Sequence, residues 1–336
     1  MRIAVLSPIA WRTPPRHYGP WELVASNLTE GLIKNGIEVT LFATADSVTK
    51  ATLDAVIEKG YEEDATQSAK VVECLHISNL MEKASEYDLV HNHFDFLPLT
   101  YSKLISTPMI TTIHGFSSQN IIPVYKKYNS NNSYVSISHS DRSPELNYIA
   151  NIYHGIDTTQ FSFNDQPDDY LLYFGRIHPD KGTVEAIEIA KRSKRRLFIA
   201  GIIQDKTYFK EKVEPSFNED IVFLGAADPE KRNTLLRNAF ALLHPINFDE
   251  PFGLSVAEAM LCGTPVIAFN KGSMPELIKD KKTGFLVNSM NEAVDAVSSL
   301  NSIDRHVCHL HAKENFSIER MVKDYIAVYE QIIYNR

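Results

Sequence analysis

The chain has 336 residues, and 42 acidic against 34 basic side chains give it a formal net charge of −8. This length is enough for two domains with cores of their own, and the acidic balance gives no overall attraction to nucleic acid or anionic lipid. Cys74, Cys262 and Cys308 form no CxxC pair, which disfavours a disulfide framework or a zinc site and predicts a cytoplasmic protein.

The first half of the chain alternates short apolar strands with helical segments. The predicted strands are IAVLSP, EVTLFAT, DLVHNHF, MITTIHGF and SYVSISHS, and WELVASNLTEGLIKNG is a predicted helix that stops at Gly36. Because Pro8 interrupts the N-terminal apolar run, we interpret that run as a buried strand and not as a signal peptide. No stretch approaches the ~18 apolar residues that span a bilayer. The alternation predicts a doubly wound parallel sheet.

A long loop, Ser7 to Pro20, follows the first strand and contains Trp11 and Gly19. Gly19 comes just before the predicted helix, where backbone N–H groups can bind a phosphate. Pro20 suits the first helical position but has no N–H to donate. The dinucleotide fingerprint GxGxxG is absent from this loop, which weighs against a dehydrogenase.

Polar side chains follow three of the later strands. Ligands of doubly wound sheets bind beyond the carboxyl ends of the strands, so we expect these side chains to converge on one site. They are His91, His93 and Asp95 in HNHFDF, His114 before Gly115, and Ser138, His139, Ser140 and Arg142.

A polar segment without periodicity divides the chain. NIYHGID, residues 151–157, is followed by TTQFSFNDQPDD, which predicts a linker and a domain boundary near residue 160. YLLYFGR, TVEAIEIAKRS, RLFIAG and IVFLGA then restart the alternation of strands and helices. We therefore predict an α/β protein with two similar domains, residues 1–160 and 161–317. A last amphipathic helix, about residues 318–336, must pack on another surface.

The segment GRIHPDKG, residues 175–182, places two cations at the end of a predicted strand. Arg176 ends the strand, and Lys181 precedes a helix that starts near Thr183. Such a pair can hold a diphosphate, with arginine as a planar fork and lysine as a point charge.

The segment from His244 to Met260 combines a strand end, a helix start and two carboxylates. The apolar strand AFALLHP stops at Pro245, and a helix can start near Gly253. Its first N–H groups, from Phe252, Gly253 and Leu254, suit an anion or a hydroxylated ligand. Glu250 precedes this helix. Glu258 lies inside it among apolar residues, so its carboxylate needs a partner.

EPFGLSVAE, with its Glu-x7-Glu spacing, followed by AMLCGTPVIA and KTGFLV, resembles the retaining glycosyltransferases of family 4, the glycosyl transferases group 1. Several motifs occur in the family's order over nearly the whole chain. The resemblance implies the GT-B fold, with two facing Rossmann-like domains and a cleft between them. The first is the acceptor-side domain and the second binds the nucleotide sugar. The C-terminal helix is then expected to cross back onto the first domain.

The resemblance also implies an activity. The expected reaction is the retaining transfer of a hexose from a nucleoside-diphosphate sugar, UDP-glucose or GDP-mannose, to a hydroxyl of a sugar, glycan or small-metabolite acceptor. The nucleotide sugar is the substrate, so no cofactor is expected. No Asp-x-Asp pattern stands where a metal-dependent transferase needs one, so we expect a metal-independent hexosyltransferase. The sequence indicates neither nucleic acid nor membrane as a partner.

By this resemblance Arg176, Lys181 and the helix N-terminus stabilise the leaving phosphate, while Glu250 binds the sugar hydroxyls and Glu258 the ribose diol. His114 matches the family histidine near the donor sugar. Glu250 is not assigned as a nucleophile. The predicted nucleotide-sugar site contains Gly19, Arg176, Lys181, Gly201, Leu224, Glu250, Phe252, Gly253, Leu254 and Glu258. The predicted acceptor side contains Trp11, His91, His93, Asp95, Ser138 and Arg142.

Three alternatives remain open. A retaining glycosidase also uses two carboxylates but has no need of a diphosphate clamp. A glycan phosphorylase or a sugar-nucleotide epimerase shares the expected architecture and differs in its products. A non-catalytic carbohydrate-binding protein would not need Arg176, Lys181, Glu250 and Glu258 together.

Overall fold

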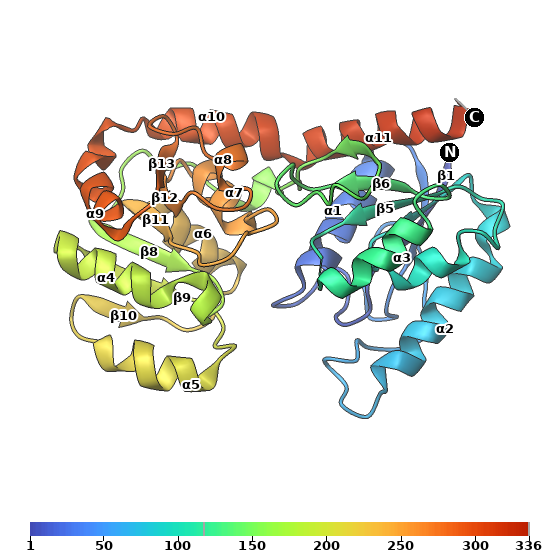
Figure 1. Ribbon diagram of the computed structural model, residues 1–336, viewed down its shortest axis with the longest axis horizontal. Helices are drawn as coiled ribbons and strands as arrows, with labels where there is room; N and C mark the ends of the chain where they lie inside the picture. Colours follow the sequence, from blue (N-terminus) through green and yellow to red (C-terminus); the bar gives the residue numbers. More distant parts are fainter. Residues whose placement is uncertain (117, 335–336) are drawn as a thin grey trace. The chain divides into compact units, whose positions relative to one another are not determined.

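The computed structural model describes residues 1–116 and 118–334 and divides the chain into two compact units (Figure 1). Unit 1 contains Met1–Gly155 together with the segment from Ile318 onward, and unit 2 contains Ile156–Ser317. The division therefore falls slightly before residue 160, and the last helix belongs to the same unit as the first strand.

Unit 1 is built on a parallel sheet of 7 strands in the order β3-β2-β1-β4-β5-β6-β7. Strand β1 pairs with β2 and β4, so that Ile3 stands opposite Val39 and Leu89. The strands are β1 (Arg2–Leu6), β2 (Glu38–Phe42), β3 (Thr52–Asp54), β4 (Leu89–Asn92), β5 (Met109–Ile113), β6 (Ser133–Ser136) and β7 (Tyr148–Asn151).

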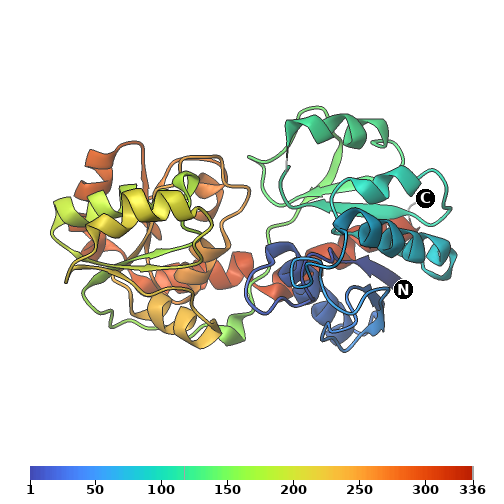
Figure 2. The same ribbon diagram turned by 90° about the horizontal axis from the view of Figure 1, so that it is seen from below.

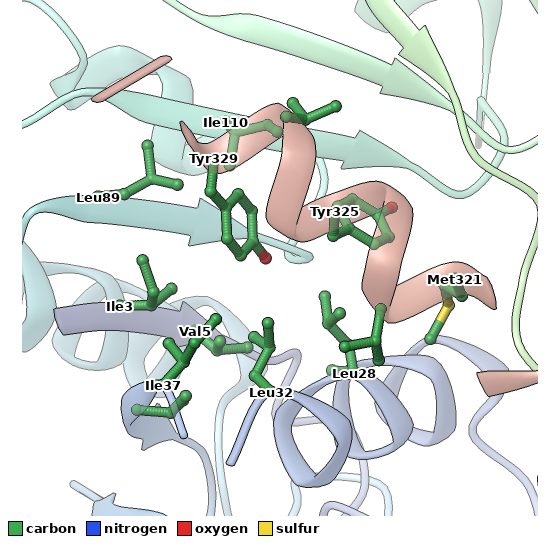
Figure 3. Packing of buried hydrophobic residues seen from close by; sticks show 14 of the residues in the cluster. Ile3, Val5, Leu28, Leu32, Ile37, Leu89, Ile110, Met321, Tyr325 and Tyr329 are labelled. Atoms are coloured by element: carbon green, nitrogen blue, oxygen red, sulfur yellow. The ribbon is translucent and has the colours of Figure 1, made fainter. Parts of the chain in front are cut away.

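Helices cover both faces of this sheet (Figure 2). They are α1 (Pro20–Lys34), α2 (Ala69–Glu82), α3 (Ile122–Lys127) and α11 (Ile318–Tyr334). One core packs α1 and α11 on the sheet, and Figure 3 shows Tyr325 and Tyr329 pointing from α11 toward side chains of β1, β4 and α1. Both tyrosines are fully buried. Helix α11 is therefore an integral part of unit 1.

Unit 2 repeats the design with 6 parallel strands in the order β10-β9-β8-β11-β12-β13. The strands are β8 (Tyr170–Phe174), β9 (Arg196–Ala200), β10 (Ile221–Phe223), β11 (Ala241–His244), β12 (Val266–Phe269) and β13 (Gly284–Val287). The helices are α4 (Thr183–Ser193), α5 (Lys206–Tyr208), α6 (Pro229–Asn238), α7 (Leu254–Leu261), α8 (Met274–Leu277), α9 (Met290–Ser299) and α10 (Arg305–Phe316). Helices α4 and α9 pack on one face of the sheet, and α7 on β11 and β12.

The predicted fold class, α/β with a doubly wound parallel sheet in each half, is confirmed. Helix α4 has the predicted bounds, and β11 ends at His244, immediately before Pro245. None of the helices within residues 1–116 and 118–334 is long and apolar enough to span a bilayer.

Candidate functional site

In unit 2 the predicted residues gather where β8 and β11, neighbours in the sheet, end. Arg176 follows β8, and its backbone carbonyl accepts a hydrogen bond of 2.7 Å from the buried Tyr173 hydroxyl. Its guanidinium Nη1 donates to Oε1 of Gln204. The guanidinium of Arg176 is thus positioned by a neutral amide, which does not compensate its positive charge, so that charge can attract an anionic ligand.

Lys181 reaches the same place because two loops are locked together. Gly182 has φ of 73°, and a Cβ there would lie 1.8 Å from the carbonyl oxygen of Pro245, so only glycine lets the turn before α4 approach the end of β11 this closely. The N–H of Asn247 donates to the Asp180 carbonyl at 2.7 Å. These contacts bring the Lys181 side chain to the loop that contains Glu250.

Lys181, Glu250 and His244 form a largely buried polar cluster. Lys181 Nζ donates to Glu250 Oε2, and His244 Nε2 lies 3.6 Å from the same oxygen. Burial alone would raise the pKa of Glu250, but His244 and the charge of Lys181 hold that pKa at about 2. Glu250 is therefore an ionised acceptor for hydroxyl groups.

Helix α7 starts at Leu254, and its N-cap residue Gly253 has a left-handed φ of 96°. Glu258, the carboxylate within this helix, is 4% exposed, and Arg232 Nη1 lies 3.3 Å from its Oε1. The Arg232 guanidinium also lies over the Phe161 ring, 5.2 Å from its centroid. Burial raises the pKa of Glu258, and Arg232 offsets part of that rise. The buried carboxylate of Glu258, which was expected to need a partner, is thus paired with Arg232 of α6.

Two backbone positions predicted for the nucleotide base lie at the ends of β9 and β10. The Gly201 N–H donates to the Gly225 carbonyl at 2.9 Å. Both backbone groups of Leu224 are occupied, because its N–H donates to Ile199 and its carbonyl accepts from Lys231 Nζ at 2.7 Å. A base can hydrogen-bond to the Leu224 carbonyl in place of Lys231 only if that side chain moves.

Unit 1 contains a cavity of about 490 Å³ beside the start of α1. Trp11, Gly19 and Asp95, three of the predicted residues, line it. Asp95 has a φ of 70°, a left-handed conformation that aspartate tolerates better than most residues. Its Oδ1 accepts a 2.5 Å hydrogen bond from the buried Tyr125 hydroxyl.

Glu22 occupies the N-terminus of α1. It is 3% exposed, and its Oε1 accepts the N–H of Trp11 at 3.3 Å. Oε2 lies so near Gly19 that a Cβ there would be 2.9 Å from it. Burial raises the pKa of Glu22 to about 7. A phosphate bound at Gly19, as the sequence predicts, would therefore meet a carboxyl group of the protein itself.

Four buried histidines form a continuous row in unit 1. His93 Nδ1 lies 2.9 Å from His114 Nε2, and His114 Nδ1 lies 3.4 Å from His154 Nε2. The His91 ring lies 4.1 Å from that of His93, and Trp21 stacks on His114 at 5.4 Å. Burial, first of all, lowers the pKa of all four, to about 3 for His93 and His154. The row is therefore neutral at physiological pH.

Not all the predicted acceptor residues offer a surface to a ligand. His91 is fully buried, and its two ring nitrogens bond to Tyr329 and Thr112, so we leave it out of the acceptor contacts. Arg142 Nε donates to Ser136 at 2.7 Å, and Ser138 hydrogen-bonds to Ser140 at 3.1 Å. These two residues shape the loop after β6.

Sequence reasoning missed five residues of these groups. His154 lies in NIYHGID, just before the predicted linker, and has no predicted role, although His154-Gly155 repeats the pair His114-Gly115 and could have been found that way. Glu22, Arg232, His244 and Gln204 have no such signal, since their contacts join residues distant in the fold. Within residues 1–116 and 118–334, no group of three or more His, Cys, Asp or Glu side chains could hold a metal ion.

Comparison with known proteins gives a consistent answer. Residues 157–308 match the family described as "Glycosyl transferases group 1". A glycosyltransferase of Methanocaldococcus jannaschii is 23% identical, with 98% of each chain covered. A 41.2 kDa protein of the cps region of Klebsiella pneumoniae is 31% identical, with 48% of this chain and 46% of its own covered.

Solved structures show the same fold. AviGT4, a glycosyltransferase involved in avilamycin A biosynthesis, matches with a TM-score of 0.74 at 22% identity, covering 100% of this chain and 99% of its own. Sucrose-phosphate synthase of Thermosynechococcus elongatus matches with a TM-score of 0.80 at 18% identity, covering 100% of both chains. The predicted GT-B fold and the resemblance to group 1 glycosyl transferases are confirmed.

Proposed function

Because residues 157–308 match the group 1 glycosyl transferases, we propose that this chain moves a hexose from a nucleoside-diphosphate sugar to an acceptor hydroxyl with retention of configuration. The observation that supports this best is the contact of Lys181 with Glu250 at the end of β11. A cation for phosphate and an ionised acceptor for sugar hydroxyls lie side by side there.

Such a site must first stabilise the leaving group, which is the nucleoside diphosphate. When the bond from sugar to diphosphate breaks, negative charge develops on the phosphate. Arg176, Lys181 and the N-terminus of α7 at Gly253–Leu254 are the positive groups proposed to stabilise it. Because these groups are preorganised by Tyr173, Gly182 and their neighbours, we propose that no metal ion is needed.

Lys181 and Glu250 form an ion pair in which their charges compensate each other. A donor would replace this contact on both sides, because its diphosphate attracts the ammonium group while its sugar hydroxyls donate to the carboxylate. Glu258, further along α7, is the proposed ribose ligand, with Arg232 holding its carboxylate in place. Gly201, Phe252 and Leu224 are proposed to border the nucleotide.

On unit 1, His114 is proposed to orient a hydroxyl of the transferring sugar. It is 7% exposed, while His93 and His154 lie deeper behind it and fix its ring. A neutral imidazole has one donor and one acceptor nitrogen. Trp11 and Asp95 are proposed on the acceptor side, and His93, which is as fully buried as His91, is proposed to act only by positioning His114.

UDP-glucose is the first donor to test and GDP-mannose the second. HepE of Anabaena, a structural neighbour at 16% identity with a TM-score of 0.71, has been solved with UDP-glucose. Nucleotide release together with a glycosylated acceptor, read by mass spectrometry, distinguishes this reaction from that of a phosphorylase, an epimerase or a non-catalytic binding protein.

A nucleoside diphosphate is expected to stabilise the protein against heat. At 100 times its dissociation constant, it should add about 2.7 kcal/mol to the free energy of unfolding. Thermal melting with UDP, GDP and ADP measures the shift, and the nucleoside alone is the control, because it lacks the phosphates that Arg176 and Lys181 would bind. If none of the diphosphates shifts the melting temperature, the proposed donor site is wrong.

Glu250→Gln and Glu258→Gln are expected to affect different ligands. Glu250→Gln should weaken the intact nucleotide sugar and leave the bare diphosphate nearly unchanged. Glu258→Gln should weaken both alike, by the ~1.5–3 kcal/mol of a charged hydrogen bond. Calorimetric titration of both variants with both ligands gives the four affinities. Equal loss of bare nucleotide in the two variants would refute the division of sugar and ribose between them.

A further inference from the structure

The cavity of unit 1 combines aromatic rings with carboxylates. Flat apolar surfaces with a few convergent polar groups are typical of small-molecule sites. Its aromatic lining comes from Trp11, Tyr18, Trp21, Tyr61, Phe94 and Phe96, and its carboxylates are Glu22, Glu73 and Asp95. These residues lie on the first loop, α1, the segment around residue 61, α2 and the end of β4.

Each carboxylate is held by a neutral donor. Glu22 accepts from the Trp11 N–H at 3.3 Å, Asp95 accepts from the Tyr125 hydroxyl at 2.5 Å, and Glu73 hydrogen-bonds to the Tyr61 hydroxyl. A carboxylate has more acceptor positions than one such donor uses. Glu73 can therefore still accept a hydrogen bond from a hydroxyl or ammonium group in the cavity, and so can Glu22 above its pKa of about 7.

Among the described residues that line the cavity, there is no lysine, arginine or histidine. Arg16, in the loop above it, is held by Asp46 at 2.9 Å and Glu63 at 2.7 Å. The N-terminus of α1, which elsewhere would attract an anion, is occupied by Glu22. A phosphate or carboxylate on a ligand would thus enter a cavity with acidic groups and no cation to bind it.

We propose that this cavity is the acceptor subsite and takes a sugar ring with free hydroxyl or amino groups, while Glu22, Glu73 and Asp95 exclude acceptors with a phosphate or carboxylate on that ring. This inference rests on the proposed glycosyltransferase function. The ring's apolar face packs on the tryptophans, and its hydroxyls donate to the carboxylates. Exclusion comes from like charge, which is a common way to obtain specificity.

The protein contains its own reporter for this cavity. The chain has 2 tryptophans, Trp11 and Trp21, and both line the cavity. Intrinsic tryptophan fluorescence therefore measures its occupancy without any donor. The full-length protein is titrated at about pH 8, where Glu22 is mostly ionised. The matched saccharides are glucose, glucosamine, maltose and N-acetylglucosamine, and the 6-phosphate of each monosaccharide.

At least one uncharged or amino sugar is expected to change the fluorescence, and its phosphorylated counterpart should bind roughly 10-fold more weakly or worse. Equal or tighter binding of the phosphorylated counterparts overturns the proposal, and so does a panel in which no sugar binds. Glu73→Lys is expected to reverse the order, because it puts a cation in the cavity. Glu58→Lys is the matched control, since Glu58 is exposed and outside the cavity, and it should leave the order unchanged.

The donor experiment separates the two proposals. If UDP or GDP raises the melting temperature but phosphorylated sugars bind best, only the acceptor proposal fails. If no nucleotide binds, while uncharged sugars still change the tryptophan fluorescence in the expected order, the transferase proposal fails and the cavity remains a sugar site. Melting curves of both lysine variants check that each is folded.

Discussion

Below about pH 5, unit 1 is expected to unfold, because it buries histidines that are neutral in the folded state. His76, His91, His93, His114 and His154 are between 0% and 7% exposed. Burial lowers the pKa of His76 to about 4 and those of His93 and His154 to about 3. In the unfolded chain these side chains titrate near their usual value of about 6.5.

A depressed folded pKa means that the unfolded state binds more protons, so stability is present above about pH 6.5 and is lost as pH falls toward 3 to 4. At pH 5, each of His76, His93 and His154 lowers the free energy of unfolding by about 2 kcal/mol, which makes about 6 kcal/mol for the three together. Glu22 acts in the opposite direction, because its pKa is raised to about 7 in the folded state. Its protonation at pH 5 adds about 2–3 kcal/mol to the free energy of unfolding. The net loss from these four groups is about 3–4 kcal/mol, a large part of the roughly 5–15 kcal/mol that stabilises a domain, and the lowered pKa values of His91 and His114 add to it.

Tryptophan fluorescence during acid titration measures this transition, because both tryptophans belong to unit 1. His76 is the best residue to replace, since its Nε2–H donates to the Ser7 carbonyl at 2.9 Å and a glutamine can donate there too. His76→Gln should move the midpoint to lower pH. His17→Gln, at an exposed position, should not. A wild-type transition below pH 4 would contradict the prediction.

Lys181→Ala and Arg176→Ala are each expected to lower turnover by roughly 10²-fold or more, because each removes a positive group at the leaving phosphate. Arg176→Lys should recover only part of the activity, since a point charge cannot replace the fork. Initial rates at saturating donor measure the effect. Lys313→Ala, at an exposed position of α10, is the control. Near-normal turnover in either alanine variant would refute the role in leaving-group stabilisation.

The double variant Lys181→Ala/Glu250→Gln tests the contact between the two side chains. Lys181→Ala alone leaves the carboxylate of Glu250 buried without its cation, which adds a stability cost to the catalytic one. Replacing Glu250 by glutamine removes that buried charge. The melting temperature of the double variant should therefore lie above the value that the two single shifts predict when added. Additive shifts would show that the two groups act independently.

The sequence predicts the elements whose pattern is local. Helix α4 begins just after Gly182, and β11 stops before Pro245, because glycine and proline fix these boundaries wherever they occur. Arg176, Lys181 and Glu250 were predicted together because each follows a strand of a parallel sheet. Helix α2 was not predicted. It buries Val72, Ile77 and Leu80 but exposes Val71 and Leu75, so its apolar residues form no single stripe.

The contacts that decide the chemistry were less predictable. Arg232 of α6 reaches Glu258 of α7, and Lys231 occupies the Leu224 carbonyl. Glu22 turns back to the start of its own helix. Each depends on how a loop closes or on which helices become neighbours, and neither periodicity nor spacing contains that information. The motif residues therefore locate the site. Their hydrogen-bond and ion-pair partners, which determine their electrostatic environment and their mobility, become visible only in the folded structure.

Unit 1 is built from two segments that are far apart in the chain, and this has a consequence for its folding during translation. Its core needs α11, whose Tyr325 and Tyr329 are fully buried against β1, β4 and α1, yet all of unit 2 is translated between Gly155 and Ile318. At ~5–20 residues per second this interval lasts roughly 10–30 s. During it, the apolar surface of the first sheet and of α1 that α11 will bury remains uncovered, while unit 2 already has a complete sequence. The N-terminal unit is thus the second to become stable on the ribosome, and its nascent form is the one that chaperones must protect.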